Sequence, residues 1–183
     1  MEDKNYYKQF DIKVGNLKAG IYNEHLHVNH LFFEKHINEY VSDGNVDIDL
    51  TIDCKERLLF LTFDMKGYLI STCDLCLESL SLPVNCVEKL IIKVVDNIEN
   101  RQNVDDESIV YISKNDYIYN VEQVIFEYFM MSLPIRKEHS NQDGDMCNQE
   151  MLNLIEKFGT ANKHENKENA TWTDALKNIK LDD

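Results

Sequence analysis

Basic residues are scarce in this sequence of 183 residues: 19 Lys and Arg stand against 33 Asp and Glu, and the formal net charge is −14. The basic residues are scattered along the chain, and no segment forms a basic stripe. Proteins that hold nucleic acid need clustered positive charge to bind phosphates and release counterions. The composition therefore argues against direct RNA binding. Two interpretations stay open, a soluble acidic protein whose charge only maintains solubility, and a partner for basic surfaces such as those of ribosomal proteins.

The sequence also lacks a long apolar run. No segment approaches the ~20 apolar residues that a membrane-spanning helix needs. The first residues, Met-Glu-Asp-Lys-Asn-Tyr-Tyr, are too polar and acidic for a secretion signal, so we expect a cytoplasmic protein. Thiols stay reduced in that compartment, and the five cysteines are therefore predicted to be core residues or metal ligands. Cys54 and Cys86 lie within strand patterns and are interpreted as small buried hydrophobic residues.

Catalytic signatures are missing as well. The sequence contains no G-x-S-x-G elbow, no Walker loop and no dinucleotide-binding glycine pattern. His25 and His27 share one strand face and could bind a metal, but such a pair is more often a solvated sheet face. Asp47, Asp49 and Asp53 are interpreted in the same way. The sequence thus predicts a protein that is not an enzyme.

Alternating apolar residues predict that much of the chain is β-strand. The cleanest alternation runs from Val46 to Cys54 and resumes, after a hairpin loop at 55–57, from Leu59 to Thr72. Further strands are predicted at 8–14, 21–28, 77–95 (with a break near Pro83) and 109–112. Gly67 is predicted to mark a bulge or bend. Helical spacing predicts helices at 30–40, 120–133 and 148–158, and an asparagine cap supports the second and the third.

These elements predict an α+β fold, in which a mostly antiparallel, strongly curved sheet or partial barrel is followed by a C-terminal helical part. We expect residues 1–158 to form a single domain. Residues 159–170 contain few apolar side chains and are predicted to be a flexible linker. Residues 171–183 are predicted to be a short helix and tail that could dock back through Trp172.

The predicted helix at 120–133 carries more apolar side chains than one face requires. Its main stripe consists of Val121, Val124, Ile125, Tyr128 and Phe129, while Phe126, Met130 and Met131 lie beyond that stripe. A helix that is apolar nearly all round is either central to the core or pressed against a partner. Both interpretations stay open from the sequence, although a core position is the commoner one.

The strongest local motif is Cys73-Asp-Leu-Cys76. Two thiols at this spacing form one arm of a tetrahedral zinc site. His139 and Cys147, on either side of a polar loop, are the candidates for the second arm. The predicted metal site is therefore Cys73, Cys76, His139 and Cys147, with structural zinc as the cofactor. Two alternatives stay open: a packed thiol pair without metal, and a redox dithiol, which the strand pattern after Cys76 disfavours because such dithiols begin a helix.

Four stretches follow one another in an order typical of a known family: Cys73-Asp-Leu-Cys76-Leu-Glu78, the acidic Asp105-Asp106-Glu107, the helix end Met131-Ser-Leu-Pro134, and Trp172-Thr-Asp-Ala-Leu-Lys-Asn-Ile179. Over residues 8 to 180 the chain resembles the YceD family, the large-subunit ribosomal RNA accumulation proteins. The resemblance implies a non-enzymatic role in 23S rRNA accumulation and large ribosomal subunit assembly.

Two departures from the family pattern shape the hypothesis. The family often carries several cysteines after the Leu-Pro block, whereas this chain has only His139 and Cys147 there, a pair that still suits zinc. Leu75 stands where arginine is common, which removes a basic contact. We therefore expect a zinc-stabilised acidic adaptor for a ribosomal protein or a large-subunit assembly intermediate. The alternative is a dithiol redox protein or sensor that uses Cys73 and Cys76.

Overall fold

The computed structural model describes residues 3–15, 17–96, 109–139 and 146–158, and its centre is a five-stranded sheet. The strands lie in the order β2 (Gly20–Val28), β3 (Asp43–Lys55), β4 (Leu58–Thr72), β5 (Ser79–Val95) and β6 (Ile109–Ser113). The first four are antiparallel to one another, whereas β6 runs parallel to β5. A separate antiparallel pair is formed by β1 (Asp11–Lys13) and β7 (Ile118–Asn120).

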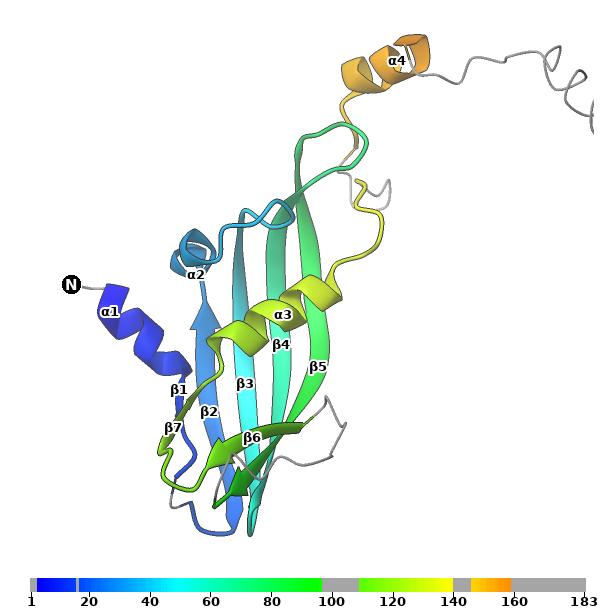
Figure 1. Cartoon of the computed structure of the whole chain (residues 1–183). Coiled ribbons are helices and arrows are strands. Elements are labelled where there is room, and N and C mark those ends of the chain that lie inside the picture. The colour runs from blue at the N-terminus through cyan, green and yellow to red at the C-terminus, as the bar shows by residue number, and fades with distance from the viewer. Residues whose placement is uncertain (1–2, 16, 97–108, 140–145, 159–183) are drawn as a thin grey trace, which may run out of the picture.

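Short helices flank the sheet. They are α1 (Asp3–Tyr6), the 3-10 helix η1 (Tyr7–Phe10), α2 (His30–Lys35), α3 (Glu122–Ser132) and α4 (Gln149–Phe158). Figure 1 shows α3 lying across one face of the sheet, and α4 beyond the turn that joins β4 to β5. Within the described part of the chain, no helix has the length and apolar character to cross a bilayer.

The predicted α+β class and mostly antiparallel pairing are confirmed. The strong curvature or partial barrel is not confirmed, because the described sheet is open, with β2 and β6 as its two edges. The single domain at 1–158 stays a prediction. The linker at 159–170 and the helix and tail at 171–183 lie outside the described residues.

The core forms between the sheet and α3. On β3 the alternation predicted from the sequence is realised, with Ile48 and Leu50 buried while Asp47 and Asp49 are exposed. The main stripe of α3 packs onto the sheet, where Ile125 and Phe129, with Val121 just before the helix, are fully buried. A hairpin loop joins β3 to β4 near the predicted position, but it consists of Glu56 and Arg57 alone, because Lys55 still belongs to β3.

The predicted helix at 30–40 is wrong in its second half, because α2 ends at Lys35. The side chain of Asn38 accepts hydrogen bonds from the backbone amides of Tyr40 and Val41, both at 2.8 Å, and so turns the chain toward β3. An asparagine side chain that binds the backbone in this way competes with a helix. Ile37, expected on the apolar stripe, is consequently exposed.

The strand predicted at 8–14 begins later, since residues Tyr7–Phe10 form η1 and only Asp11–Lys13 form β1. The three apolar side chains that suggested a strand, Phe10, Ile12 and Val14, are nevertheless all buried. Their alternation therefore indicates burial correctly and secondary structure only in part.

Two irregularities predicted within the sheet are absent. The strand β5 runs through Pro83 in continuous register with β4, where Pro83 opposes Tyr68. Proline is tolerated there because the outer side of β5 has no described partner before Ile91, so no ladder hydrogen bond is lost. Gly67 makes no bulge either: its φ is +156°, and a Cβ there would lie 2.1 Å from the carbonyl oxygen of Asn45.

Candidate metal centre

The turn between β4 and β5 positions the first pair of thiols. The amide of Cys73 donates to the carbonyl of Glu78 at 2.9 Å, and the amide of Leu77 donates to the carbonyl of Cys73 at 3.0 Å. Leu77 closes the turn with a φ of +62°. Both Cys73 and Cys76 are buried in this tight turn. No helix follows Cys76, so the setting of a redox dithiol, a helix N-terminus, is absent from this part of the described chain.

A latch between Asp74 and Lys137 brings the second arm to the turn. The amide of Asp74 donates to the carbonyl of Lys137 at 2.7 Å, and the amide of Lys137 donates to the Asp74 carboxylate at 2.7 Å. The Lys137 ammonium also lies 3.8 Å from that carboxylate. The segment that leaves α3 is thus held against the turn two residues before His139.

His139 is oriented as a metal-binding histidine would be. Its Nε2–H donates to the carbonyl of Ser79 at 3.1 Å, which leaves Nδ1 as the nitrogen that faces the sulfurs. From Nδ1 the distances are 3.5 Å to Cys76 Sγ and 3.7 Å to Cys147 Sγ. Ligating histidines commonly donate their other N–H to a backbone carbonyl, which sets both tautomer and ring orientation.

All four predicted residues meet in one place, which we call the Cys3His cluster: Cys73, Cys76, His139 and Cys147. Their ligand atoms lie within 4.8 Å of one another, and the sulfurs of Cys73 and Cys147 are 3.7 Å apart. A zinc tetrahedron with Zn–S of about 2.3 Å and Zn–N of about 2.0 Å has S–S edges of about 3.8 Å and S–N edges of about 3.5 Å. The cluster therefore fits a tetrahedral cation, although its geometry does not identify the ion.

The surroundings of Cys73 favour a thiolate. Burial alone would raise the pKa of this thiol, but hydrogen bonds to its sulfur from the backbone amides of Cys76, Leu75 and His139 outweigh that effect and lower the pKa to about 6. For Cys147, burial and hydrogen bonding with the neighbouring thiols raise the pKa to about 11. One thiol is thus ready to bind a cation at neutral pH, and a cation would displace the proton of the other.

The helix α4 begins next to the cluster. Directly after Cys147, the Asn148 side chain accepts from the amide of Glu150 at 2.9 Å and donates to the Glu78 carboxylate at 2.6 Å. Met151 packs against a small apolar group that is separate from the main core and includes Cys73, Cys76 and Leu80. A single ion here would join the β4–β5 turn, the segment after α3 and the start of α4.

Sequence reasoning missed the groups that support the ligands. The Asp74–Lys137 latch and the Ser79 carbonyl are not ligands themselves, yet they place His139. A partial signal was available, because Asp74 lies between the two cysteines of the motif and Lys137 lies two residues before His139. Only the tertiary contact shows that the two side chains meet.

The remaining candidates lie away from the cluster. His25 Nδ1 is 2.9 Å from an Asp49 oxygen and His27 Nδ1 is 2.8 Å from an Asp47 oxygen, on the exposed face of β2 and β3. The interpretation as a solvated sheet face is thereby supported. Cys54 belongs to the main core, as expected for a small hydrophobic residue.

Comparison with known proteins identifies a family. The family model described as "Large ribosomal RNA subunit accumulation protein YceD" matches residues 61–180. This range contains the whole Cys3His cluster, α3 and α4, whereas residues 8–60 of the resemblance noted above lie outside it. Neither a curated protein nor a solved structure matches the chain.

Proposed function

The chain belongs to the YceD family, and from this membership we propose that it acts in 23S rRNA accumulation and large ribosomal subunit assembly. Its proposed role is that of a non-enzymatic, zinc-stabilised acidic adaptor that works in the cytoplasm. The adaptor engages a basic ribosomal protein or an assembly intermediate of the large subunit. The observation that carries the proposal is the convergence of the Cys3His cluster in a family-matched segment of a strongly acidic chain.

The donor set supports structural zinc. Three sulfurs and one imidazole nitrogen make a closed tetrahedral site with no position left for a substrate or water, which is typical of structural rather than catalytic zinc. The hydrogen bond from His139 Nε2–H to the Ser79 carbonyl, which fixes the ring that would bind the ion, agrees with this role. Such an ion would hold the C-terminal part of the described chain against the sheet without doing chemistry.

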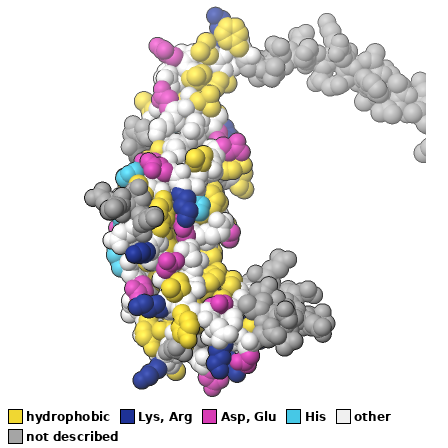
Figure 2. Space-filling view, turned by 60° about the vertical axis from the view of Figure 1, so that its left-hand side comes forward, with side chains coloured by type: hydrophobic (Ala, Val, Ile, Leu, Met, Phe, Trp, Pro, Cys, Tyr) yellow, Lys and Arg dark blue, Asp and Glu magenta, His cyan; other side chains and the backbone are white. Residues whose placement is uncertain are grey.

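The excess of negative charge on the chain favours a basic protein as the partner over protein-free RNA. The net charge is −14, and several of the basic side chains are paired with carboxylates. Within the described ranges, six Lys or Arg side chains lie at ion-pair distance from Asp or Glu: Lys35, Lys55, Arg57, Lys66, Arg136 and Lys137. Figure 2 shows positive and negative side chains interspersed on the face in view. A surface of this kind attracts basic proteins and repels phosphates.

Gradient sedimentation tests the proposal. We expect the tagged protein to migrate with precursors of the large subunit in low salt and to dissociate as salt screens the charges. Cells that lack it should accumulate less 23S rRNA, and Cys76→Ser should fail to restore that level. Cys86→Ser is the matched control, because Cys86 packs against the main core and is remote from the cluster. Absence from such particles, or tight salt-sensitive binding to protein-free rRNA, would refute the adaptor.

The second candidate is a dithiol redox protein or sensor at Cys73 and Cys76. The observation in its favour is the lowered pKa of Cys73. This observation alone does not separate the two functions, since zinc binding and thiol exchange both use the thiolate. Metal analysis separates them: about one zinc per chain after purification without chelator supports the adaptor. A metal-free protein that cycles reversibly between the dithiol and a Cys73–Cys76 disulfide supports the redox function.

A further inference from the structure

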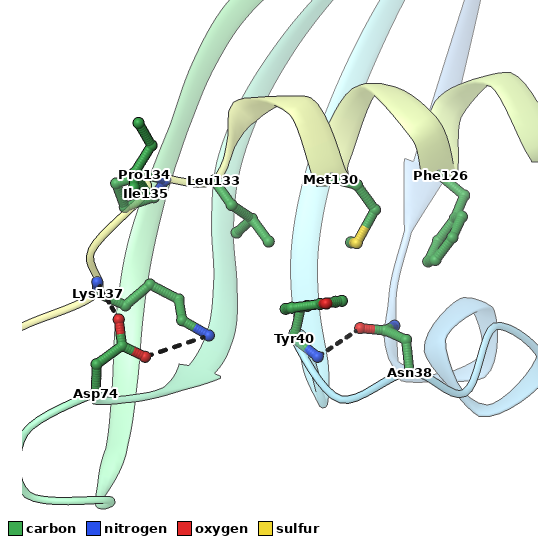
Figure 3. A pocket seen from close by; sticks show the side chains of 9 residues that line it. All are labelled: Asn38, Tyr40, Asp74, Phe126, Met130, Leu133, Pro134, Ile135 and Lys137. Carbon is green, nitrogen blue, oxygen red and sulfur yellow. Dashed lines mark hydrogen bonds and ion pairs between the residues drawn. The ribbon is translucent and has the colours of Figure 1, made fainter. Parts of the chain in front are cut away.

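An apolar groove of about 550 Å³ lies next to the Cys3His cluster. Figure 3 shows α3 forming one wall, the loop after α2 the opposite wall, and the Asp74–Lys137 latch closing one end. We call this the latch groove, and its lining residues are Asn38, Tyr40, Asp74, Phe126, Met130, Leu133, Pro134, Ile135 and Lys137.

The helix wall of the latch groove is a second apolar stripe on α3. Phe126 and Met130, with Leu133 just after the helix, follow one another at spacings of four and three residues, the pattern of one helix face. This stripe is distinct from the buried main stripe that faces the sheet, and its side chains are only partly buried. The structure thus resolves the ambiguity of the sequence, because α3 uses one stripe for the core and presents the other to the groove.

The opposite wall leaves apolar surface uncovered. Tyr40 is 52% exposed although it lines the groove, and the Lys137 ammonium lies 5.6 Å from the centre of its ring. Ile135 is fully exposed at the rim. Apolar side chains gathered around a concavity usually mark a site that another segment covers.

One segment of this same chain suits the groove. In residues 171–179, the tail segment, Trp172, Ala175, Leu176 and Ile179 recur at i, i+3, i+4 and i+7, the spacing of one apolar helix face. An amphipathic helix can lay such an apolar face into an apolar groove, and the second stripe of α3 forms one wall of a groove of this kind. The family match ends at residue 180, so the tail segment and the latch groove belong to the same matched unit.

The chain between them is long enough. Phe158 ends α4, and residues 159–170 lead to the tail segment. Extended at ~3.4 Å per residue, this connection reaches about 40 Å, which is larger than a small domain's radius of about 13 Å. Linked segments also meet at high effective concentration, so that even a weak contact is populated.

We propose that the tail segment docks into the latch groove of its own chain, with Trp172 as the apolar anchor. A buried indole needs an acceptor for its N–H. The Asp74 carboxylate, still partly exposed at the end of the groove, supplies one. The inference is independent of the proposed ribosomal role, because it concerns a contact within one chain that exists with or without a partner.

Trp172 is the single tryptophan of the chain, so its fluorescence reports on the tail segment alone. In the folded 183-residue chain we expect the emission maximum of Trp172 at a shorter wavelength than in the urea-unfolded chain, and weaker quenching by acrylamide. Met130→Gln, inside the groove, should abolish both effects. Met131→Gln is the matched control, because Met131 is the next residue on α3 but is 71% exposed and lies outside the lining. Circular dichroism of each variant verifies that the fold is kept.

A second groove variant is needed in case Met130→Gln disturbs the fold. Ile135→Glu places a charge at the rim on a fully exposed side chain, so it cannot disturb the core, and it should also release Trp172. Three results would overturn the inference: a wild-type Trp172 as accessible as in urea, a protected Trp172 that neither groove variant releases, or protection that rises with protein concentration. The last result would identify a second copy of the chain as the occupant.

Discussion

Replacement of Cys76 by serine should release the C-terminal part of the described chain and leave the sheet intact. The reason is that α4 has no buried residue, and its ten residues are too few for a stable isolated helix. The small apolar group beneath it contains three buried side chains, Cys73, Cys76 and Leu80. Without an ion, little else holds the segment from 146 to 158.

The size of the effect follows from the metal. Structural zinc supplies an apparent ~10–16 kcal/mol in zinc-finger peptides, and a site that lacks one of four ligands loses a large part of this. We expect the free energy of local opening at 146–158 to fall by about 5 kcal/mol. Because every ~1.4 kcal/mol is a factor of ten, amides there should exchange roughly a thousand to ten thousand times faster. Amides of β3 and β4 belong to the main core and should change little.

Peptide-resolved hydrogen exchange, paired with elemental analysis, is the assay. Wild-type protein purified without chelator should contain about one zinc per chain, Cys76→Ser much less, and the control Cys86→Ser as much as wild type. Chelator added to wild type should reproduce the exchange pattern of Cys76→Ser. The reasoning is refuted if both serine variants protect residues 146–158 equally, or if wild type contains no metal.

Three further predictions concern the fold. In urea unfolding, Gly67→Ala should lower the free energy of unfolding by about 1–3 kcal/mol more than Gly20→Ala does. Both glycines have a φ of +156°, but only at Gly67 would a Cβ meet backbone, 2.1 Å away. Equal losses of stability would contradict the close approach. Glu122→Gln should lower the free energy of unfolding by about 1–3 kcal/mol and lower the melting temperature with it. The reason is that the Glu122 carboxylate is only 5% exposed and lies 2.7 Å from the Lys35 ammonium and 2.9 Å from the His36 ring. Glu34→Gln is the control, because Glu34 is exposed and its replacement should change the melting temperature little. Burial raises the pKa of Tyr6 from 10.0 to about 12. As pH rises, this phenol therefore ionises first in the unfolded chain, and the free energy of unfolding should fall between pH 10 and pH 12. Urea titrations at the two pH values should show a smaller fall for Tyr6→Phe than for wild type.

Local patterns predicted those parts of the fold whose determinants are local. The alternation in β3 sets its buried face. The side chain of Asn120 accepts from the amide of Glu122 at 3.0 Å, but from one residue before Val121, which is the N-cap of α3 in the structure. The pattern failed where a tertiary or side-chain contact decides. Asn38 ends α2 by capturing backbone amides, and Pro83 is accommodated because it lies at a sheet edge. Edge position depends on strand order, which alternation does not encode.

The candidate site, too, has a part that local sequence predicts and a part that depends on tertiary contacts. The spacing of Cys73 and Cys76 is a local signal, and it identified the first arm. For the second arm, the sequence offers His139 and Cys147 as ligands of suitable chemistry, and the structure brings them to the same place. What no spacing could give is the orientation of His139, because the Ser79 carbonyl that receives its N–H lies 60 positions away in the chain.

The separation of the two arms along the chain has a consequence for biosynthesis. Cys73 and Cys147 are 74 positions apart. A ribosome that adds ~5–20 residues per second therefore needs about 4–15 s to make the second arm after the first. During that interval the strands of the main sheet can already pair, while Cys73 and Cys76 wait for Cys147 to be synthesised. Capture of a cation would thus be among the last events in maturation, and its supply would govern how quickly each newly made chain is finished.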